Sequence, residues 1–295
     1  MLMPAVNLPV HWVNGKKGGG ISPLDRGLRY GDGLFETVLI TNGGAILWGR
    51  HLQRLLRGCE SLALNVDSRS IETHFFQFLA QLSDADRVSA IARITVSRGP
   101  GAHGYRPQRT TEPTFIVSFD KHVYVASESL RLCRCKVAAV NHSGLAGIKH
   151  LNRLANVLAA GELEDGGHDE GVMCLDDGSV ISGVMSNLFI VKDGCLLTPK
   201  LSLAGVAGTA RSLVIDVLAP ELNVTCDETT LSYHDLLQAD EIFMCNSVMG
   251  IRPVAALGET LWRDWPLTAR LMDRYQLASR LETVSHKELQ PMDKK

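Results

Sequence analysis

Hydrophobic residues in the first 120 positions follow two spacings, one typical of strands and one typical of amphipathic helices. Short runs rich in β-branched and aromatic residues predict strands at residues 12–15, 34–40, 45–48, 89–96 and 114–119. Hydrophobic residues three or four positions apart predict helices at residues 51–64 and 71–82. The Thr41-Asn42-Gly43-Gly44 segment is a turn signal that makes a hairpin of the strands on either side of it. The first part of the chain therefore predicts a small α+β domain.

The second part of the chain alternates strands and helices in a different order. The predicted strands are residues 132–140, 170–175, 180–181, 188–191 and 240–245. The predicted helices are residues 151–163, 209–218 and 267–281. Polar residues at 120–128 separate the two parts, and the sequence contains no internal repeat. We expect a small N-terminal domain over residues 1–120, a linker over residues 121–130 and a larger C-terminal domain over residues 131–295.

Composition narrows the class of partner. The 295 residues are 45% hydrophobic, enough to bury the cores of one large or two smaller globular domains. Thirty Lys and Arg residues against 32 Asp and Glu residues give a formal net charge of -2, without any basic block. This charge gives no support to binding of nucleic acid or an anionic membrane, so a small-molecule partner is favoured. We expect neither a secretory signal at the start of the chain nor a segment that spans a bilayer.

Seven cysteines are scattered along the chain, and only Cys133 and Cys135 are close together. Their spacing places both thiols on one face of a strand, but no second cysteine or histidine pair follows at the spacing of a zinc site. We therefore expect no metal site and interpret the cysteines as buried free thiols in a reducing cytoplasm.

The segment Gly99-Pro100-Gly101-Ala102-His103-Gly104 matches the glycine spacing of a dinucleotide-binding turn. Such a turn opens a helix, whereas here Tyr105-Arg106-Pro107 follows, and proline disfavours helical backbone at the residue before it. The sequence favours a mobile loop near a site over a dinucleotide-binding turn.

One lysine lies just before the predicted apolar helix at residues 151–163, in the segment Gly147-Ile148-Lys149-His150-Leu151-Asn152-Arg153-Leu154. A lysine amine is a useful nucleophile only when its surroundings lower its pKa or when a carbonyl compound traps it as an imine. Taken alone, a lysine at this place is more often structural or exposed to water.

Two other features also have alternative interpretations. The glycine-rich turn at residues 203–208 runs into a predicted helix, where free backbone N–H groups make either an anion site or a plain structural turn. Arg54 lies on a predicted helix, where most arginines are exposed to water. Their order along the chain favours a functional interpretation over a structural one. A phosphorylated aldehyde needs an ordered set of ligands, and the chain offers Arg54, Lys149, Asn187, the glycine turn and Asn246-Ser247-Val248.

Several segments in this order resemble the fold-type IV pyridoxal-phosphate enzymes, a group that contains branched-chain aminotransferases, D-amino-acid aminotransferases and aminodeoxychorismate lyases. The segments are residues 31–37, 50–55, 97–99, 147–154, 186–189, 205–211 and 238–241. The resemblance spans residues 12–253. Within the group, residues 147–153 are most similar to the aminodeoxychorismate lyases.

The resemblance implies an α/β (α+β) fold with a small α+β N-terminal domain and a larger C-terminal domain that has a mixed, barrel-like sheet and helices. It places pyridoxal 5'-phosphate between the two domains, usually in a homodimer whose partner lends residues to the site. Lys149 would bind the cofactor covalently through its amine. The other expected cofactor ligands are Arg54, Ser182, Asn187, Gly208, Thr209, Ala210, Ser247 and Val248, of which Arg54 and the last five hold the phosphate.

As a lyase of this kind, the chain would convert 4-amino-4-deoxychorismate to 4-aminobenzoate and pyruvate in folate biosynthesis. The substrate amine displaces Lys149, whose freed amine removes the proton from the carbon that carries the substrate amine. By loop position, Arg98 and Arg153 are expected to bind the substrate's carboxylates, and Phe35 and Tyr105 to line the pocket for its ring.

Ser182 departs from the pattern of these enzymes, which commonly carry a glutamate there that pairs with the pyridine nitrogen of the cofactor. The lost charged hydrogen bond, about 1.5–3 kcal/mol, would weaken the electron sink by roughly tenfold to a few hundredfold. Asp176 and Asp177 are candidates for a compensating acid. Two alternatives to the lyase therefore stay open: a fold-type IV aminotransferase, and a pyridoxal-phosphate-binding protein of weakened activity.

Overall fold

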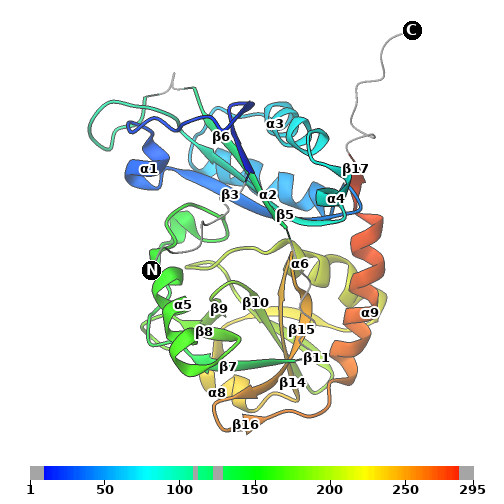
Figure 1. Cartoon of the computed structure of the whole chain (residues 1–295). Coiled ribbons are helices and arrows are strands. Elements are labelled where there is room, and N and C mark those ends of the chain that lie inside the picture. Colours follow the sequence, from blue (N-terminus) through cyan, green and yellow to red (C-terminus); the bar gives the residue numbers. More distant parts are fainter. Residues whose placement is uncertain (1–9, 109–111, 122–128, 286–295) are drawn as a thin grey trace, which may run out of the picture. The chain divides into compact units, whose positions relative to one another are not determined.

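The computed structural model of the chain describes residues 10–108, 112–121 and 129–285 (Figure 1). The chain divides into two compact units: unit 1 consists of Met1–Tyr124 and Thr283–Lys295, and unit 2 of Val125–Glu282. The expected domains differ from these units at the C-terminal end, because the described residues 283–285 belong to unit 1. Most of the expected linker, residues 122–128, lies outside the described residues.

Unit 1 is built on a seven-stranded sheet in the order β17-β4-β3-β5-β6-β1-β2. Its long strands β3 (Gly33–Thr41), β5 (Ser89–Ser97) and β6 (Thr114–Lys121) pair antiparallel. Its short strands are β1 (Val10–Val13), β2 (Lys16–Lys17), β4 (Gly44–Ala45) and β17 (Val284–Ser285). Because β17 pairs with β4, the chain returns to unit 1 after unit 2 is complete.

The described helices of unit 1 are α1 (Arg26–Tyr30), α2 (Trp48–Ser61), α3 (Ser68–Ala80) and α4 (Asp84–Arg87). Trp48 of α2 stacks on Phe75 of α3 with 4.2 Å between the ring centroids, which joins the two long helices in the core. The strand predicted at residues 45–48 is wrong in its second half. Leu47 has a left-handed backbone with φ 55°, which ends the strand, and Trp48 begins α2.

Unit 2 contains a ten-stranded mixed sheet in the order β12-β11-β10-β14-β15-β7-β8-β9-β13, with β16 paired to β15. Its strands are β7 (Leu130–Arg134), β8 (Glu170–Cys174), β9 (Ser179–Gly183), β10 (Asn187–Lys192), β11 (Cys195–Pro199), β12 (Cys226–Thr229), β13 (Leu231–Ser232), β14 (Glu241–Asn246), β15 (Gly250–Leu257) and β16 (Thr260–Leu261). Buried residues of β10 and of β13, which are far apart in this order, meet in one cluster, so the sheet curls around a shared core. The expected α+β fold with a mixed sheet in the larger domain is confirmed.

The described helices of unit 2 are η1 (Ser143–Leu145), α5 (Leu154–Gly166), α6 (Thr209–Leu213), η2 (Val214–Leu218), α7 (Ala219–Glu221), α8 (Tyr233–Leu237) and α9 (Pro266–Leu281). The segments α6, η2 and α7 follow one another without a break. The Glu241 carboxylate accepts hydrogen bonds from the N–H groups of Leu267 and Thr268 at 2.9 and 2.8 Å, which satisfies the first turn of α9.

The strand predicted at residues 132–140 is correct only as far as Arg134. Beyond it, the N–H groups of Lys136 and Val137 donate to the carboxylate of Glu162 in α5, at 2.7 and 3.0 Å. These two N–H groups are therefore not paired with a neighbouring strand, which interrupts the ladder, although the Ala139 N–H donates again to the Cys174 carbonyl of β8 at 2.8 Å.

All seven cysteines are free thiols, and four of them are buried. Burial raises the pKa of Cys59, Cys135 and Cys245 to about 12, so these thiols stay protonated and unreactive. Within the described ranges, no helix combines the length and the apolar character needed to cross a membrane.

Candidate active site

The segment that carries Lys149 is joined to the glycine-rich turn before α6. Gly147 forms a parallel bridge with Val206, its N–H donates to the Gly205 carbonyl at 3.1 Å, and its carbonyl accepts from the Ala207 N–H at 2.9 Å. Gly147 and Gly205 have left-handed backbone, with φ of 81° and 88°, which glycine adopts without strain. The lysine segment and the turn, two separate features of the sequence, therefore lie side by side.

A second set of hydrogen bonds holds the other side of the lysine segment. The Arg153 guanidinium donates through Nε to the His150 carbonyl at 3.0 Å and through Nη2 to the Ile148 carbonyl at 3.1 Å. Lys149, which is half-buried, is the residue between these two. Arg153, predicted to bind a substrate carboxylate, is thus engaged with the backbone around Lys149.

His150, the neighbour of Lys149, is a neutral imidazole at physiological pH. Burial, together with the positive charges of Arg153 and His142, lowers the pKa of His150 to about 4. Its Nδ1 accepts a hydrogen bond from the Asn152 N–H at 3.2 Å, which agrees with an unprotonated ring nitrogen. His150 therefore adds no charge beside the lysine.

Asn187, the first residue of β10, ties the same glycine turn to the sheet. Its Nδ2 donates to the Val206 carbonyl at 2.9 Å. A β-carbon on Gly208 would lie 2.0 Å from Asn187 Oδ1, so only glycine allows this approach. The structure gives Asn187 a role in holding the turn, and its contact with a cofactor stays a prediction.

The predicted phosphate ligands Gly208, Thr209 and Ala210 form the start of α6. No side chain caps this helix end. The Thr209 hydroxyl is buried and has no hydrogen-bond partner among the residues that the structure describes. The first N–H groups of a helix and an unpartnered hydroxyl are donors that an oxyanion requires. This donor set therefore fits a phosphate group.

The turn after β14 carries the predicted pair Ser247 and Val248. Asn187 pairs with Cys245 across β10 and β14, so this turn begins beside Asn187. The Val248 N–H donates to Oδ1 of Asn246 at 2.9 Å. Because that N–H is used inside its own turn, the structure does not favour Val248 as a phosphate ligand, whereas Ser247 keeps this predicted role.

Ser182 lies in β9 opposite Met173 of β8, and its hydroxyl donates to the Gly183 carbonyl at 2.8 Å. Asp176 and Asp177 do not compensate for the missing carboxylate, because both lie in the exposed turn between β8 and β9. The Asp177 carboxylate accepts from the Ser179 N–H at 2.9 Å, at the far end of β9. Ser182 is three positions beyond Ser179 on the extended strand, a distance of about 10 Å.

Glu170 is a buried acid that the sequence analysis missed. Its carboxylate, in a residue only 3% exposed, accepts from the N–H groups of Gly171, Val184 and Met185 at 3.0, 2.8 and 3.2 Å and from the Ser186 hydroxyl at 2.7 Å. It thereby fixes the turn that leads from β9 into Asn187. The sequence held a signal for this role, because an acidic residue at the start of an apolar strand needs hydrogen-bond partners when it is buried.

In unit 1, Arg54 is buried beside Glu36 and His51. Its Nε donates to Oε1 of Glu36 at 2.7 Å and its Nη2 to Oε2, while His51 Nδ1 lies 2.6 Å from Oε2. Burial alone would raise the pKa of Glu36, but Arg54 and His51 more than offset this effect and lower the pKa to about 2. Arg54 is thus an oriented, buried guanidinium rather than a helical arginine in water.

Phe35 precedes Glu36 in β3, so the two side chains point to opposite faces of the sheet. The Arg93 guanidinium covers the Phe35 ring at 3.9 Å from its centroid. The structure therefore does not bring Phe35 to the sheet face where Arg54 meets Glu36, and its place in a substrate pocket stays a prediction.

The contacts of Arg98 do not favour its predicted role as a substrate ligand. Its guanidinium donates to both carboxylate oxygens of Asp32 at 2.8 and 3.1 Å and to the carbonyls of Leu62 and Ala63 at 2.6 and 3.1 Å. Arg98 is 8% exposed and links the end of β5 to the end of α2. These four bonds use the donors that a substrate carboxylate would need.

The glycine-rich loop after β5 is fastened to α1. The Arg26 N–H donates to the Gly99 carbonyl at 2.9 Å, and its guanidinium donates to the carbonyls of Gly104 and Tyr105 at 2.9 and 2.8 Å. The Tyr105 ring is 84% exposed and contacts Tyr30, with 5.4 Å between the ring centroids. No helix follows this loop in residues 105–108, which the structure describes, whereas a dinucleotide-binding turn opens one, and Arg26 is a contact that the sequence analysis missed.

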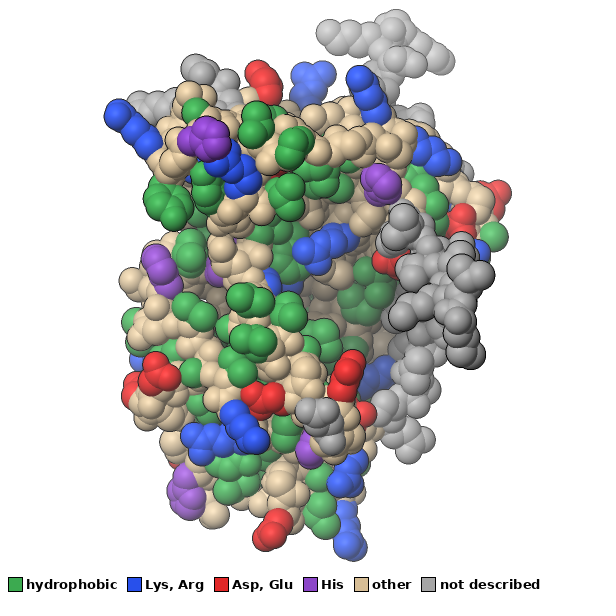
Figure 2. All heavy atoms as spheres, turned by 60° about the vertical axis from the view of Figure 1, so that its left-hand side comes forward, with side chains coloured by type: hydrophobic (Ala, Val, Ile, Leu, Met, Phe, Trp, Pro, Cys, Tyr) green, Lys and Arg blue, Asp and Glu red, His purple; other side chains and the backbone are tan. Residues whose placement is uncertain are grey.

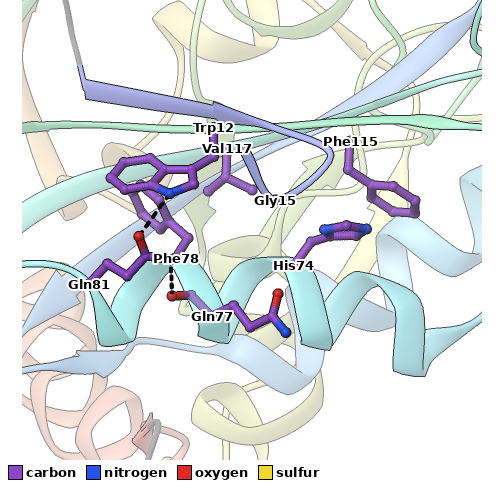
Figure 3. A pocket seen from close by; sticks show the side chains of 8 residues that line it. All are labelled: Trp12, Gly15, His74, Gln77, Phe78, Gln81, Phe115 and Val117. Carbon is purple, nitrogen blue, oxygen red and sulfur yellow. Dashed lines mark hydrogen bonds between the residues drawn. The ribbon is translucent and has the colours of Figure 1, made fainter. Parts of the chain in front are cut away.

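A small cavity in unit 1 is too small for a cofactor (Figure 3). Its volume of about 10 Å³ holds roughly one water molecule. It is lined by Trp12, Gly15, His74, Gln77, Phe78, Gln81, Phe115 and Val117. Among the described residues, no group of three or more His, Cys, Asp or Glu side chains can hold a metal ion.

The curled mixed sheet joins a lysine segment to a turn whose donors fit a phosphate group. The chain belongs to the aminotransferase class IV family, whose model matches residues 33–257. The enzymes of this family use pyridoxal phosphate. The resemblance indicated by the sequence motifs is confirmed.

The relatives of this chain include both lyases and aminotransferases. The chain is 35% identical to aminodeoxychorismate lyase of Vibrio harveyi, over 83% of this chain and 90% of that protein. It is 32% identical to a putative branched-chain-amino-acid aminotransferase of Methanocaldococcus jannaschii, over 82% and 86%. The solved structure of 4-amino-4-deoxychorismate lyase from Pseudomonas aeruginosa has 39% identity and a TM-score of 0.86, and the match covers 92% of this chain and 100% of that one.

Proposed function

We propose that this chain is a pyridoxal-phosphate-dependent lyase that converts 4-amino-4-deoxychorismate to 4-aminobenzoate and pyruvate, a step of folate biosynthesis. The observation that carries the chemistry is the Gly147–Val206 bridge, which joins the lysine segment to an anion-binding helix start. The choice of substrate is supported by 39% identity to the Pseudomonas aeruginosa lyase across that whole chain.

Different residues of unit 2 bind different parts of the cofactor in this proposal. The Lys149 amine binds its carbonyl carbon. The first N–H groups of α6 and the unpartnered Thr209 hydroxyl hold its phosphate. The further proposed phosphate ligands in unit 2 are Gly208, Ala210 and Ser247.

The reaction removes one proton from the carbon that carries the substrate amine and adds one proton to a carbon of the leaving group. When bound, pyridoxal phosphate withdraws electrons from the carbon that carries the substrate amine. The Lys149 amine would act as the base that removes the proton from that carbon. The bond between the ring and the enolpyruvyl oxygen then breaks. The overall reaction takes up no net proton, so the proton held by Lys149 would balance the one that the leaving group needs to depart as pyruvate while the ring becomes aromatic.

An aminotransferase of the same family is the second candidate, and the 32% identity to the Methanocaldococcus jannaschii protein favours it. The surroundings of Ser182 argue against it. The Ser182 hydroxyl donates to its neighbour's carbonyl, and the carboxylate of Glu170 is already occupied by four donors. An elimination that gains aromaticity depends less on a strong electron sink than full transamination does.

A product assay separates the two candidates. Incubation of the pyridoxal-phosphate-loaded protein with 4-amino-4-deoxychorismate should release 4-aminobenzoate and pyruvate in equal amounts. Transfer of the amino group from D-alanine or a branched-chain amino acid to 2-oxoglutarate, without any 4-aminobenzoate, would overturn the lyase.

We also propose a homodimer in the cytoplasm. Helix α5 exposes Leu154, Val157 and Leu158 on one face, at 71%, 63% and 57%. Figure 2, which turns the α5 side of Figure 1 forward, shows hydrophobic side chains grouped on this surface. An apolar face of this kind is typical of a subunit interface, and sedimentation equilibrium should give twice the chain mass. The seven free thiols support a reducing compartment.

A further inference from the structure

The contacts of Arg153 determine how Lys149 is held. The two carbonyls that accept from its guanidinium belong to Ile148 and His150, at 3.1 and 3.0 Å, the residues on either side of Lys149. Peptide units are planar, so fixing both carbonyls limits rotation of the backbone through Lys149. One rigid group therefore sets the direction in which the lysine side chain leaves the backbone.

Arg153 is itself anchored to a packed helix. Its carbonyl accepts from the Val157 N–H at 3.0 Å, in the first turn of α5. Further along α5, Ala159 and Leu163 are buried in a cluster with Met173 of β8. The guanidinium thus connects the lysine segment to the core of unit 2, while Gly147 connects its other end to the glycine turn.

The same contacts compete with a role in substrate binding. Nε and Nη2 form one edge of the guanidinium, and such an edge is what binds a carboxylate through two parallel hydrogen bonds. In Arg153 both of these donors face backbone carbonyls. A substrate carboxylate at this edge would have to displace them.

We propose that Arg153 is a positioning residue that holds Lys149 toward the glycine turn and is not a ligand of a substrate carboxylate. The proposal rests on the proposed function only in taking Lys149 as the cofactor lysine. It predicts that lysine at position 153 is a poor substitute, because a single ammonium group lacks the planar fork that reaches two carbonyls.

The first test is made on the cofactor-free protein, where it is independent of activity. Hydrogen exchange of the peptide over residues 147–153 should be about tenfold faster in Arg153→Lys and Arg153→Gln than in the wild type. Arg131→Lys is the matched control, because Arg131 lies on an exposed position of β7 in the same unit. Unchanged exchange in both Arg153 variants would show that the hydrogen bonds from Arg153 do not hold the backbone around Lys149, and would overturn the proposal.

The second test uses pyridoxal phosphate. Both Arg153 variants should capture it more slowly, measured as the rise of visible absorbance, and kcat should fall about 10- to 100-fold with KM within about threefold. A KM that rises tenfold or more, with absorbance and kcat retained, would identify Arg153 as a substrate ligand and overturn the proposal. If the wild type captures no pyridoxal phosphate, the proposed function fails, and the exchange measurement still decides the role of Arg153.

Discussion

Asn187 Oδ1 lies 2.0 Å from the place that a β-carbon on Gly208 would take. The other end of the same amide donates to the Val206 carbonyl at 2.9 Å. One side chain of β10 therefore binds the glycine turn at Val206 and packs closely against it at Gly208. Because Ala207, between these two contacts, donates to Gly147, the position of the turn and the position of the lysine segment depend on each other.

Gly208→Ala should weaken the binding of pyridoxal phosphate. The added methyl group must displace Asn187 or the start of α6, which moves the donors proposed for the phosphate. We expect the dissociation constant from absorbance titration to rise at least about tenfold, the equivalent of ~1.4 kcal/mol. Gly49→Ala in α2 is the control, because a β-carbon there meets nothing within 4 Å. Equal affinity of Gly208→Ala and wild type would contradict the assignment of this turn.

Glu36→Gln should destabilise the protein in a pH-dependent way. Removing one partner of a buried ion pair leaves Arg54 uncompensated and costs about 3–5 kcal/mol near neutral pH. The folded-state pKa of Glu36 is about 2, below the ordinary value of 4.5. The contribution of the carboxylate is therefore complete above pH 4.5 and is lost as the pH falls from there toward 2.

Urea unfolding of wild type and Glu36→Gln at several pH values measures this effect. The difference in the free energy of unfolding should be largest at pH 5 and above and should shrink as the pH is lowered toward 3. A difference that stays constant over this range would show that the Glu36 charge does not stabilise the fold.

Ser182→Glu should strengthen the electron sink. A carboxylate at this position would supply the charge that Ser182 lacks, since Glu170 is occupied and Asp177 binds Ser179, which is about 10 Å from Ser182 along the strand. Turnover should rise roughly tenfold or more, with the larger gain in any transamination activity. Ser182→Gln is the matched variant without charge. If the wild type turns over substrate efficiently and Ser182→Glu leaves that rate unchanged, the hypothesis that Ser182 weakens the activity is wrong.

Much of the fold was predictable because its longer elements follow regular hydrophobic spacing. Strands β3, β5, β6, β8 and β10 and helices α2, α3, α5 and α9 all overlap their predicted ranges. The missed elements lack this signal. Strand β15 contains Pro253, which disfavours a strand interior, and α1 is only five residues long.

The candidate site was predictable as a set of motifs but not as a set of contacts. Lys149, Asn187 and Gly208 stand in recognisable segments, and the structure brings these segments together. The partners of Arg98 and Arg153 could not be read from the sequence, because both guanidinium groups donate to backbone carbonyls, which every residue possesses. A loop position alone does not distinguish an arginine that binds substrate from one that holds the backbone.

Lys149 as the cofactor lysine is the central claim, and it can be tested on the protein directly. The protein is loaded with pyridoxal phosphate, reduced with borohydride, digested and mapped by mass spectrometry, with Lys149→Ala treated in parallel. We predict one reduced cofactor per chain, on the peptide that contains Lys149, and neither visible absorbance nor label in Lys149→Ala. A label on a different lysine, or a Lys149→Ala protein that keeps both colour and full activity, would contradict the account.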